Sequence, residues 1–189
     1  MEFPGYDPRG SHGLALAYAT SDRGACHQRA FAAEEDVFGP MDPFTFEGKA
    51  AVVKRQQDFN SAKDSLIICD MWRPSPETLA EMFTKVTGLA MTAEELFECG
   101  ERIWNIGHLF NLREGFTRAD DTLPLRIMTE KLKNGPAADK ELKAEEFEQT
   151  LTELYSLRGW DENGNVTQEN LERLYVDSAL FSLVRGGKH

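Results

Sequence analysis

Apolar residues recur every three or four positions along much of the chain, which is the spacing of one face of a helix. The longest such run follows Thr92, where the sequence Thr92-Ala93-Glu94-Glu95 matches a capping box. Its apolar positions are Leu96, Cys99, Ile103, Ile106 and Phe110. The pattern therefore predicts the longest helix of the protein, ending near Gly115.

Other segments carry the same helical pattern over shorter lengths. The sequence Ser75-Pro76 is typical of a helix start, because serine accepts a backbone N–H bond and proline fills the first helical position without losing a needed donor. Gly88 is a matching stop signal. The further helices are expected over about 14–20, 48–63, 76–88 and a tail helix that carries Phe147, Leu151 and Leu154 and ends at Gly159.

Proline and glycine interrupt these helices with loops. The first thirteen residues contain two prolines and three glycines, which predicts a shaped loop rather than a helix. The apolar run Leu66–Cys69 is too short to classify and could be a buried helix end or a strand-like passage. A charged stretch over 131–143 is expected to be mobile and marks a candidate subdivision of the chain. No segment shows strand alternation, so the sequence predicts an all-α fold with long shaped loops.

Composition limits the classes of partner and the cellular compartment. The 189 residues carry 32 acidic and 21 basic side chains, a formal net charge of -11, so nucleic acid is not expected as a partner. No apolar run approaches the roughly 20 residues of a membrane helix, and no signal peptide is recognisable. We therefore expect no membrane association and a cytoplasmic location. Three widely spaced cysteines do not make a disulfide framework, which leaves free thiols or metal ligation.

Two short sequences could carry chemistry. Cys26-His27 follows a glycine turn and offers two metal ligands or a proton-transfer group, but the same residues suit an ordinary helix start. Asp64 and Cys69 stand at the two ends of a short apolar stretch. The carboxylate could accept hydrogen bonds from a heterocycle or a guanidine-like edge, and the thiolate could bind iron or zinc. The alternative is a capping aspartate with a buried cysteine.

Other candidate features have simpler explanations. The sequence from Asp161 to Glu172 resembles the oxygen spacing of a calcium loop, but Val166 stands where that loop needs glycine, so a solvated turn is expected. Cys99 lies on the apolar helix face and is expected in the core. Packing is expected to account for the three tryptophans, and exposed charge for Asp120-Asp121.

Six further blocks of sequence follow one another along nearly the whole chain. The blocks are Gly5–Gly10, Leu16–His27, Asp64–Cys69, Phe110–Phe116, Asp120–Pro124 and Leu157–Asp161. In this order they resemble the tungsten-containing aldehyde ferredoxin oxidoreductase family. The order matters because several ordered blocks are far more specific than one motif.

The resemblance implies a two-electron oxidoreductase that converts aldehydes to carboxylic acids. Family members use a tungsten bis-pterin cofactor beside a 4Fe-4S cluster that passes electrons to ferredoxin. The chain 1–189 is similar only to the family's carboxy-terminal helical part, helical domains 2 and 3. The amino-terminal pterin-cradling domain and three closely spaced cluster cysteines are absent from it. The resemblance therefore implies a partial chain that is inactive alone and needs a missing amino-terminal portion or subunit as its partner.

The resemblance also assigns roles to individual residues. Cys69 matches the fourth ligand of the iron-sulfur cluster, and Asp64 matches the pterin-binding aspartate that opens the same motif. Ile68 stands at the motif's usual leucine among the cofactor-binding positions, while Ile67 replaces its usual glycine. His27 falls on the active-site histidine, a proton donor or acceptor near tungsten.

The resemblance also assigns a role to Arg29 and bears on the electron acceptor. Arg29 falls where a basic side chain contacts pterin. Because ferredoxins are typically acidic and this chain is acidic as well, general electrostatic steering to its surface is disfavoured. A homodimer is left open as a further assembly. The alternative is a cofactor-free helical structural or interaction domain derived from the family. The isoleucine at position 67 favours this alternative, whereas Asp64, Cys69 and His27 favour the enzyme.

Overall fold

The computed structural model describes residues 5–177, and this part of the chain is helical with no strand longer than an isolated bridge. The predicted all-α fold with long shaped loops is confirmed. The longer helices are α1 (His12–Ala19), α2 (Lys49–Ser65), α3 (Pro76–Thr87), α4 (Ala93–Arg113) and α6 (Ala144–Leu157). The short elements are η1 (Pro8–Gly10), η2 (Glu34–Phe38), η3 (Arg118–Asp120), α5 (Leu125–Thr129) and α7 (Gln168–Arg173).

The helix ends follow the signals in the sequence. The hydroxyl of Thr92 accepts from the backbone N–H of Glu95, and the Glu95 carboxylate accepts from the N–H of Thr92, so the capping box of α4 is complete. Ser75 caps α3 in the expected way, and Gly88 ends it with a left-handed φ of 74°. Local side-chain chemistry is therefore sufficient to fix both of these helices.

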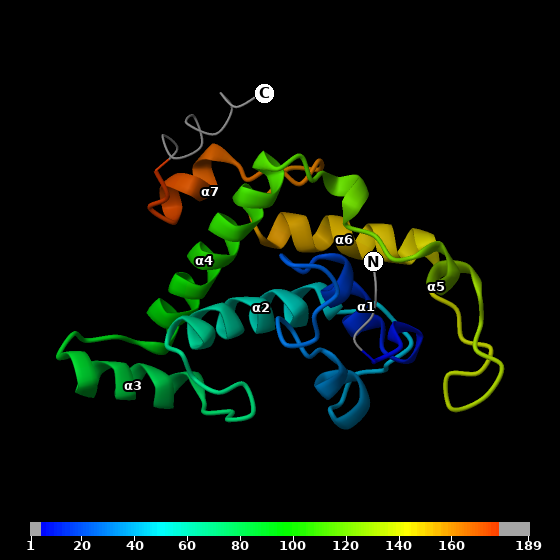
Figure 1. The fold of residues 1–189 in the computed structure, drawn as a ribbon, viewed down its shortest axis with the longest axis horizontal. Coiled ribbons are helices and arrows are strands. Elements are labelled where there is room, and N and C mark those ends of the chain that lie inside the picture. Colours follow the sequence, from blue (N-terminus) through cyan, green and yellow to red (C-terminus); the bar gives the residue numbers. More distant parts are fainter. Residues whose placement is uncertain (1–4, 178–189) are drawn as a thin grey trace.

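Helix α2 is the centre of the molecule and packs against α1, α4 and α6 (Figure 1). All eight residues of α1 are buried, as expected for an apolar helix enclosed on every side. The main core joins α1 to the amino-terminal part of α2, to Trp104 of α4 and to Phe147, Leu151 and Leu154 of α6. Helix α3 lies at one end of the molecule and the segment 130–143 at the opposite end (Figure 1).

Charged side chains are buried where the helices meet. Arg158, which follows α6, is fully buried and donates to the Asp58 carboxylate at 3.0 Å and to the side-chain amide oxygen Oε1 of Gln57 at 2.6 Å. Lys54 joins Asp58 to Glu101 of α4 with ion pairs of 2.8 and 3.1 Å. These contacts connect α2, α4 and the end of α6, so the core holds a paired charge network rather than isolated charges.

Some features of the fold differ from the expectations. The η2 element is a π-helix, and α5 and α7 were not expected. The ambiguous run after α2 is a loop, because α2 ends at Ser65 and Ile67 has a φ of 57°. In the 131–143 segment, the Asp139 N–H donates to the Leu132 carbonyl at 3.0 Å, and Leu142 is buried. The subdivision of the chain at this segment stays a prediction.

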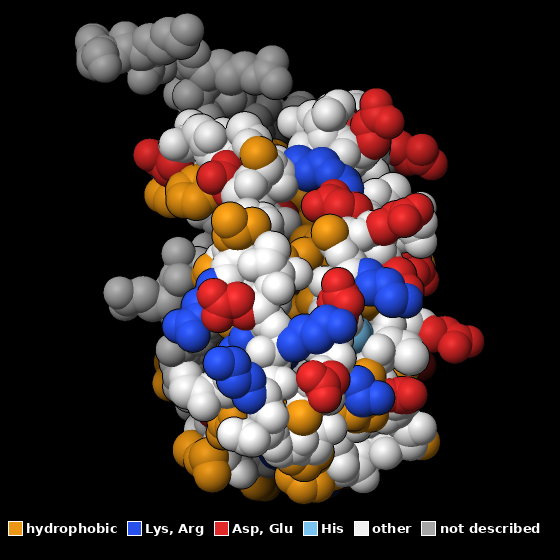
Figure 2. Space-filling view, turned by 90° about the vertical axis from the view of Figure 1, so that its right-hand side faces the viewer, with side chains coloured by type: hydrophobic (Ala, Val, Ile, Leu, Met, Phe, Trp, Pro, Cys, Tyr) orange, Lys and Arg blue, Asp and Glu red, His pale blue; other side chains and the backbone are white. Residues whose placement is uncertain are grey.

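The surface carries both signs of charge. On the face shown in Figure 2, lysine and arginine side chains lie among aspartate and glutamate side chains. The net negative charge is therefore not concentrated on this face. Within residues 5–177, no helix has the length and apolar character needed to cross a membrane.

Candidate functional site

Arg29 joins two carboxylates that are 42 positions apart in the sequence. Its Nη1 atom donates to Asp64 at 2.9 Å, and its Nε atom forms an ion pair with Asp22 at 3.0 Å. The three side chains are largely shielded from water, which strengthens these contacts relative to a fully exposed pair. Asp64 thus accepts a hydrogen bond from a guanidinium group. A guanidine-like donor was one of the two kinds of donor expected for this carboxylate from the sequence.

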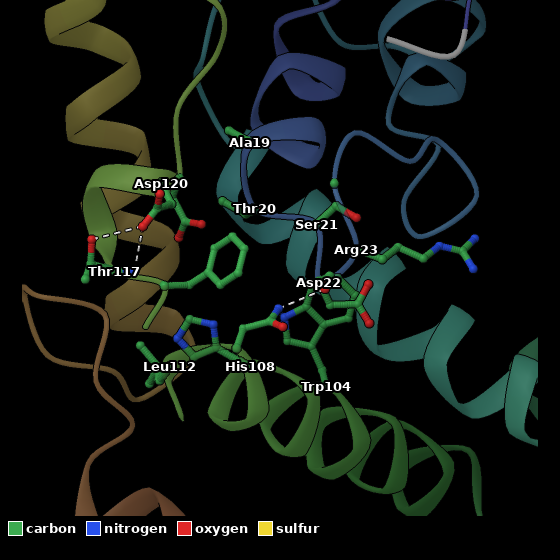
Figure 3. Close-up of a pocket in the computed structure, with 14 residues that line it drawn as sticks. Ala19, Thr20, Ser21, Asp22, Arg23, Trp104, His108, Leu112, Thr117 and Asp120 are labelled. Atoms are coloured by element: carbon green, nitrogen blue, oxygen red, sulfur yellow. Dashed lines mark hydrogen bonds between the residues drawn. The ribbon is translucent and has the colours of Figure 1, made fainter. Parts of the chain in front are cut away.

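The backbone around this bridge is fixed by α2 and α4. Asp64 lies in the last turn of α2, one turn after Asn60. The Asn60 amide donates to the carbonyls of Gln28 at 2.9 Å and Arg29 at 3.2 Å, so it holds the loop against the same helix face. From the other side, the Asn111 amide of α4 donates to the Asp22 carbonyl at 2.8 Å (Figure 3). Two helices therefore position one loop with side-chain amides.

His27 lies in the same loop, among aromatic side chains. Its ring makes edge contacts with Tyr6 at 4.9 Å and with Phe31 at 6.0 Å between ring centroids. The Nδ1 atom of His27 is buried and has no hydrogen-bond partner in the described part of the chain. A histidine that packs between two aromatic rings and has a ring nitrogen without a hydrogen-bond partner can still accept or donate a proton.

The neighbouring cysteine is engaged by an arginine. The Arg23 guanidinium donates to the Cys26 sulfur at 3.0 and 3.3 Å. Within residues 5–177, no three His, Cys, Asp or Glu side chains come close enough together to hold a metal ion. The Cys26-His27 pair is therefore not part of such a cluster within residues 5–177.

Cys69 lies on the exposed loop between α2 and α3 as a free thiol. Ile68 packs partly buried against the small core of Ala62, Leu79 and Leu96, so the loop is attached on that side. Ile67 is 93% exposed beside it. The other exposed apolar side chains of this loop are Met71 and Trp72. The expectation that packing accounts for all three tryptophans is wrong for Trp72, which is 46% exposed.

The donor set of this loop fits part of the cofactors that the sequence suggested. An exposed thiol can serve as one ligand of an iron-sulfur cluster, and a 4Fe-4S cluster needs four such thiolates. A carboxylate already holding a guanidinium can accept the N–H edge of a pterin ring. These residues could therefore supply part of the contacts to the iron-sulfur cluster and to the pterin. The remaining ligands would have to come from another polypeptide.

A cavity of about 310 Å³ lies beside the loop that contains Asp22 (Figure 3). The lining comes from the end of α1 and the loop after it, from the second half of α4, and from the segment around η3. Its aromatic members include Trp104, His108 and Phe116. Its acidic members are Asp22, Asp120 and Asp121.

Asp121 is the residue of this cavity that the sequence did not indicate, since Asp120-Asp121 was expected to be exposed charge. It accepts a short hydrogen bond from the Tyr155 hydroxyl, and burial raises its pKa to about 6 despite that bond. His108 stacks flat on Trp160, and its Nε2 lies 2.7 Å from the Gly164 carbonyl. Burial lowers the His108 pKa to about 4, so its ring is neutral near pH 7.

The sequence of this chain is similar to those of known proteins. Residues 1–176 match the family model described as aldehyde ferredoxin oxidoreductase, domains 2 and 3. The tungsten-containing aldehyde ferredoxin oxidoreductase of Pyrococcus furiosus is 35% identical over 183 residues, which covers 93% of this chain and 30% of that protein. The enzyme of the same description from Thermococcus kodakarensis is 33% identical over 187 residues, covering 95% of this chain and 30% of that protein.

A solved structure is similar in fold. The active-site complex BamBC of benzoyl coenzyme A reductase, in complex with 1,5-dienoyl-CoA, matches with a TM-score of 0.62. The match covers 76% of this chain and 21% of the chain in the solved structure, at 22% sequence identity. At that identity the likeness shows a shared fold and nothing about ligands. The chain also spans only about 30% of the length of the tungsten-containing relatives it matches.

Proposed function

The chain belongs to the aldehyde ferredoxin oxidoreductase family, and from that membership we propose that it is the carboxy-terminal portion of a tungsten-dependent enzyme that oxidises aldehydes to carboxylic acids. In this proposal ferredoxin accepts the electrons, and the chain acts only together with an amino-terminal portion or subunit. The covered share of the relatives supports the second point, since most of their length lies outside this chain. A homodimer and a cytoplasmic location stay predictions.

The observation that carries the proposal is the Asp22–Arg29–Asp64 bridge. One ion pair holds Asp64 to Arg29, and a second holds Arg29 to Asp22, next to the loop that bears His27. We assign Asp64, Arg29 and Ile68 to the binding of the pterin and Cys69 to the iron-sulfur cluster. When bound, the tungsten pterin and the cluster would supply the two-electron oxidation and the route for the electrons.

The residues of this chain then have binding and proton-handling roles. Asp64 would accept N–H groups of the pterin ring, while Arg29 stays paired with Asp22 and keeps the loop in place. His27 would take or give a proton at Nδ1, the ring nitrogen that has no partner within residues 5–177. The Tyr6 and Phe31 rings would hold the imidazole in place during that transfer.

The test is co-expression of this chain with the remaining portion of the Pyrococcus furiosus relative, followed by metal analysis for tungsten and iron. We expect both metals in the purified complex. Cys69→Ser should strongly reduce the iron content, because it removes one thiolate of the cluster. Cys99→Ser is the matched control, since its thiol lies half-buried on α4 and its loss should affect packing rather than iron. Equal loss of iron in both variants would contradict the assignment of Cys69.

One observation favours the alternative, a cofactor-free helical domain derived from the family. Ile67 stands where the family usually has glycine and has a left-handed backbone, with its side chain exposed at the edge of the loop. A β-branched side chain there could keep a cofactor from approaching the backbone. Formation of a stable complex that contains neither tungsten nor iron would support this alternative.

A further inference from the structure

The cavity beside α4 contains carboxylates that have no basic partner. Asp120 accepts from the N–H of Thr117 at 2.8 Å and from its hydroxyl at 3.1 Å, and Asp121 accepts from Tyr155. Neither Asp120 nor Asp121 forms an ion pair within residues 5–177, although these residues contain many such pairs. Asp120 is exposed, whereas Asp121 is half-buried. A half-buried carboxylate without a paired counter-charge is costly, and a bound cation would offset that cost.

The nearby arginines are already engaged elsewhere. Arg23 lines the cavity, but its side chain points away from Asp120 in Figure 3, and it donates to Cys26. Arg118 pairs with Glu148 at 2.9 Å and lies over the Tyr155 ring. Asp22, the third carboxylate of the lining, is neutralised by Arg29. Asp121 is therefore the half-buried carboxylate of the lining that has no ion pair within residues 5–177, and Arg118 acts on it only without direct pairing.

Two further polar groups of the lining can accept hydrogen bonds, the Ser21 hydroxyl, which can also donate, and the His108 ring. The Ser21 hydroxyl is buried without a partner within residues 5–177. Because the neutral His108 ring lies in hydrogen-bond contact with a carbonyl through Nε2, that nitrogen carries the proton, and Nδ1 is left as an acceptor. The Asn111 amide, a donor of the lining, is already used by the Asp22 carbonyl. An occupant rich in N–H donors would satisfy these groups.

The remaining walls are aromatic and apolar. Trp104 and Phe116 line the cavity together with Leu112 and Ala19. Aromatic faces attract a cation and also bury an apolar body. A bare metal ion does not suit this lining, because no three metal-binding side chains gather within residues 5–177.

We propose that this cavity binds a small organic cation, a primary ammonium group carried on an aryl or alkyl body. The ammonium group would lie against Asp120 and Asp121, and the apolar body would lie against Trp104 and Phe116. The volume of about 310 Å³ suits a ligand of this size. The lining shares Asp22 with the Asp22–Arg29–Asp64 bridge, but Asp120 and Asp121 have no role in the proposed function, so the proposal does not depend on it.

Calorimetric titration of the 189-residue chain with three probes of similar shape tests the proposal. The probes are 2-phenylethylammonium, the neutral 2-phenylethanol and the anionic phenylacetate. At pH 7.5 and low salt we expect the ammonium to bind about tenfold more tightly than the alcohol, with the carboxylate weakest. Nuclear magnetic resonance should show the largest shifts at the Trp104 indole and the Asn111 side-chain amide, which both line the cavity.

Two variants identify the group responsible. Asp121→Asn keeps an acceptor for Tyr155 and should lower the affinity for the ammonium about tenfold while leaving 2-phenylethanol unchanged. Glu94→Gln removes an exposed carboxylate at the opposite end of α4 and should change neither affinity. Equal binding of ammonium and alcohol, or full ammonium affinity in Asp121→Asn, would overturn the proposal. If that variant fails to fold, the ranking of the three probes on the unaltered chain decides the question.

Discussion

At the scale of single residues, Ile67 has a backbone conformation that β-branched residues rarely adopt. Its φ is 57°, and its side chain is exposed and gains little from packing. Ile67→Gly should therefore raise the free energy of unfolding by about 1 kcal/mol, because glycine adopts this φ without steric cost. Urea unfolding followed by circular dichroism measures the change.

The neighbouring isoleucine is the matched control for this prediction. Ile68 packs against the small core between α2, α3 and α4 and does not have a positive φ. Ile68→Gly should therefore destabilise the chain. A loss of stability in Ile67→Gly comparable to that in Ile68→Gly would show that the conformation of residue 67 is not strained.

His12 predicts a pH dependence of stability. It is buried, stacks on Phe46 and has no partner for either ring nitrogen within residues 5–177, and burial lowers its pKa to about 4. The unfolded chain takes up a proton near the ordinary pKa of 6.5 and the folded chain does not, so the free energy of unfolding should fall as pH drops from 6.5 to 4.

His12→Phe tests this contribution, since phenylalanine keeps the stacking and cannot be protonated. The stability difference between the variant and the parent chain should grow in the variant's favour by on the order of 2 kcal/mol between pH 7 and pH 4. Thermal or urea unfolding at several pH values measures it. Parallel pH profiles for the two chains would mean that His12 takes up its proton as readily in the folded chain as in the unfolded chain.

At the scale of elements, the crossing of α2 and α4 depends on one glycine. A Cβ atom at Gly100 would lie 1.8 Å from the Asp58 carbonyl oxygen, far inside contact distance. The two helices can approach this closely only without a side chain at position 100. Such close packing explains why α2 and α4 share the largest helix-to-helix contact of the described fold.

Gly100→Ala should lower the free energy of unfolding by about 3 kcal/mol, because the helix axes must move apart. Gly107→Ala is a control on the same helix, where the added Cβ would meet the Asp22 carboxylate at an ordinary 3.6 Å. That substitution should be neutral or stabilising through helix propensity. Similar stabilities for the two alanine variants in chemical unfolding would contradict this account of the crossing.

At the scale of the whole molecule, Arg158 connects parts of the chain that are about 100 residues apart. Its guanidinium reaches Asp58 and Gln57 of α2, and its cation lies over the Trp104 and Trp160 rings. Because Arg158 is fully buried, removing it leaves partners in the core with incomplete hydrogen bonding.

Arg158→Met should reduce the free energy of unfolding by about 3 kcal/mol, as expected when one partner of a buried ion pair is removed. Arg126→Met is the comparison, because the pair of Arg126 with Glu130 is exposed and should contribute less than about 0.5 kcal/mol. Guanidinium chloride unfolding of both variants gives the two values. A small effect at Arg158 would contradict the assignment of a stabilising role to its buried pair with Asp58.

The sequence by itself determined the main helices and the fold class. Helix periodicity and the caps at Ser75 and Thr92 depend on residues within one or two turns, so they can be read without tertiary information. The ordered sequence blocks also indicated the family that the match over residues 1–176 shows. Of the candidate site, the residue types were predictable, but the partners of Asp64 and His27 were not.

The tertiary structure alone decided which of these residues meet. Arg29 bridges Asp22 and Asp64, and Tyr155 covers Asp121, across separations of 7 to 35 residues along the chain. The exposed loop around Cys69 and the acceptor-rich cavity likewise depend on how α2, α4 and their loops pack. The physical reason is that burial and charge pairing act through space, whereas the signals in the sequence act over a few neighbouring residues.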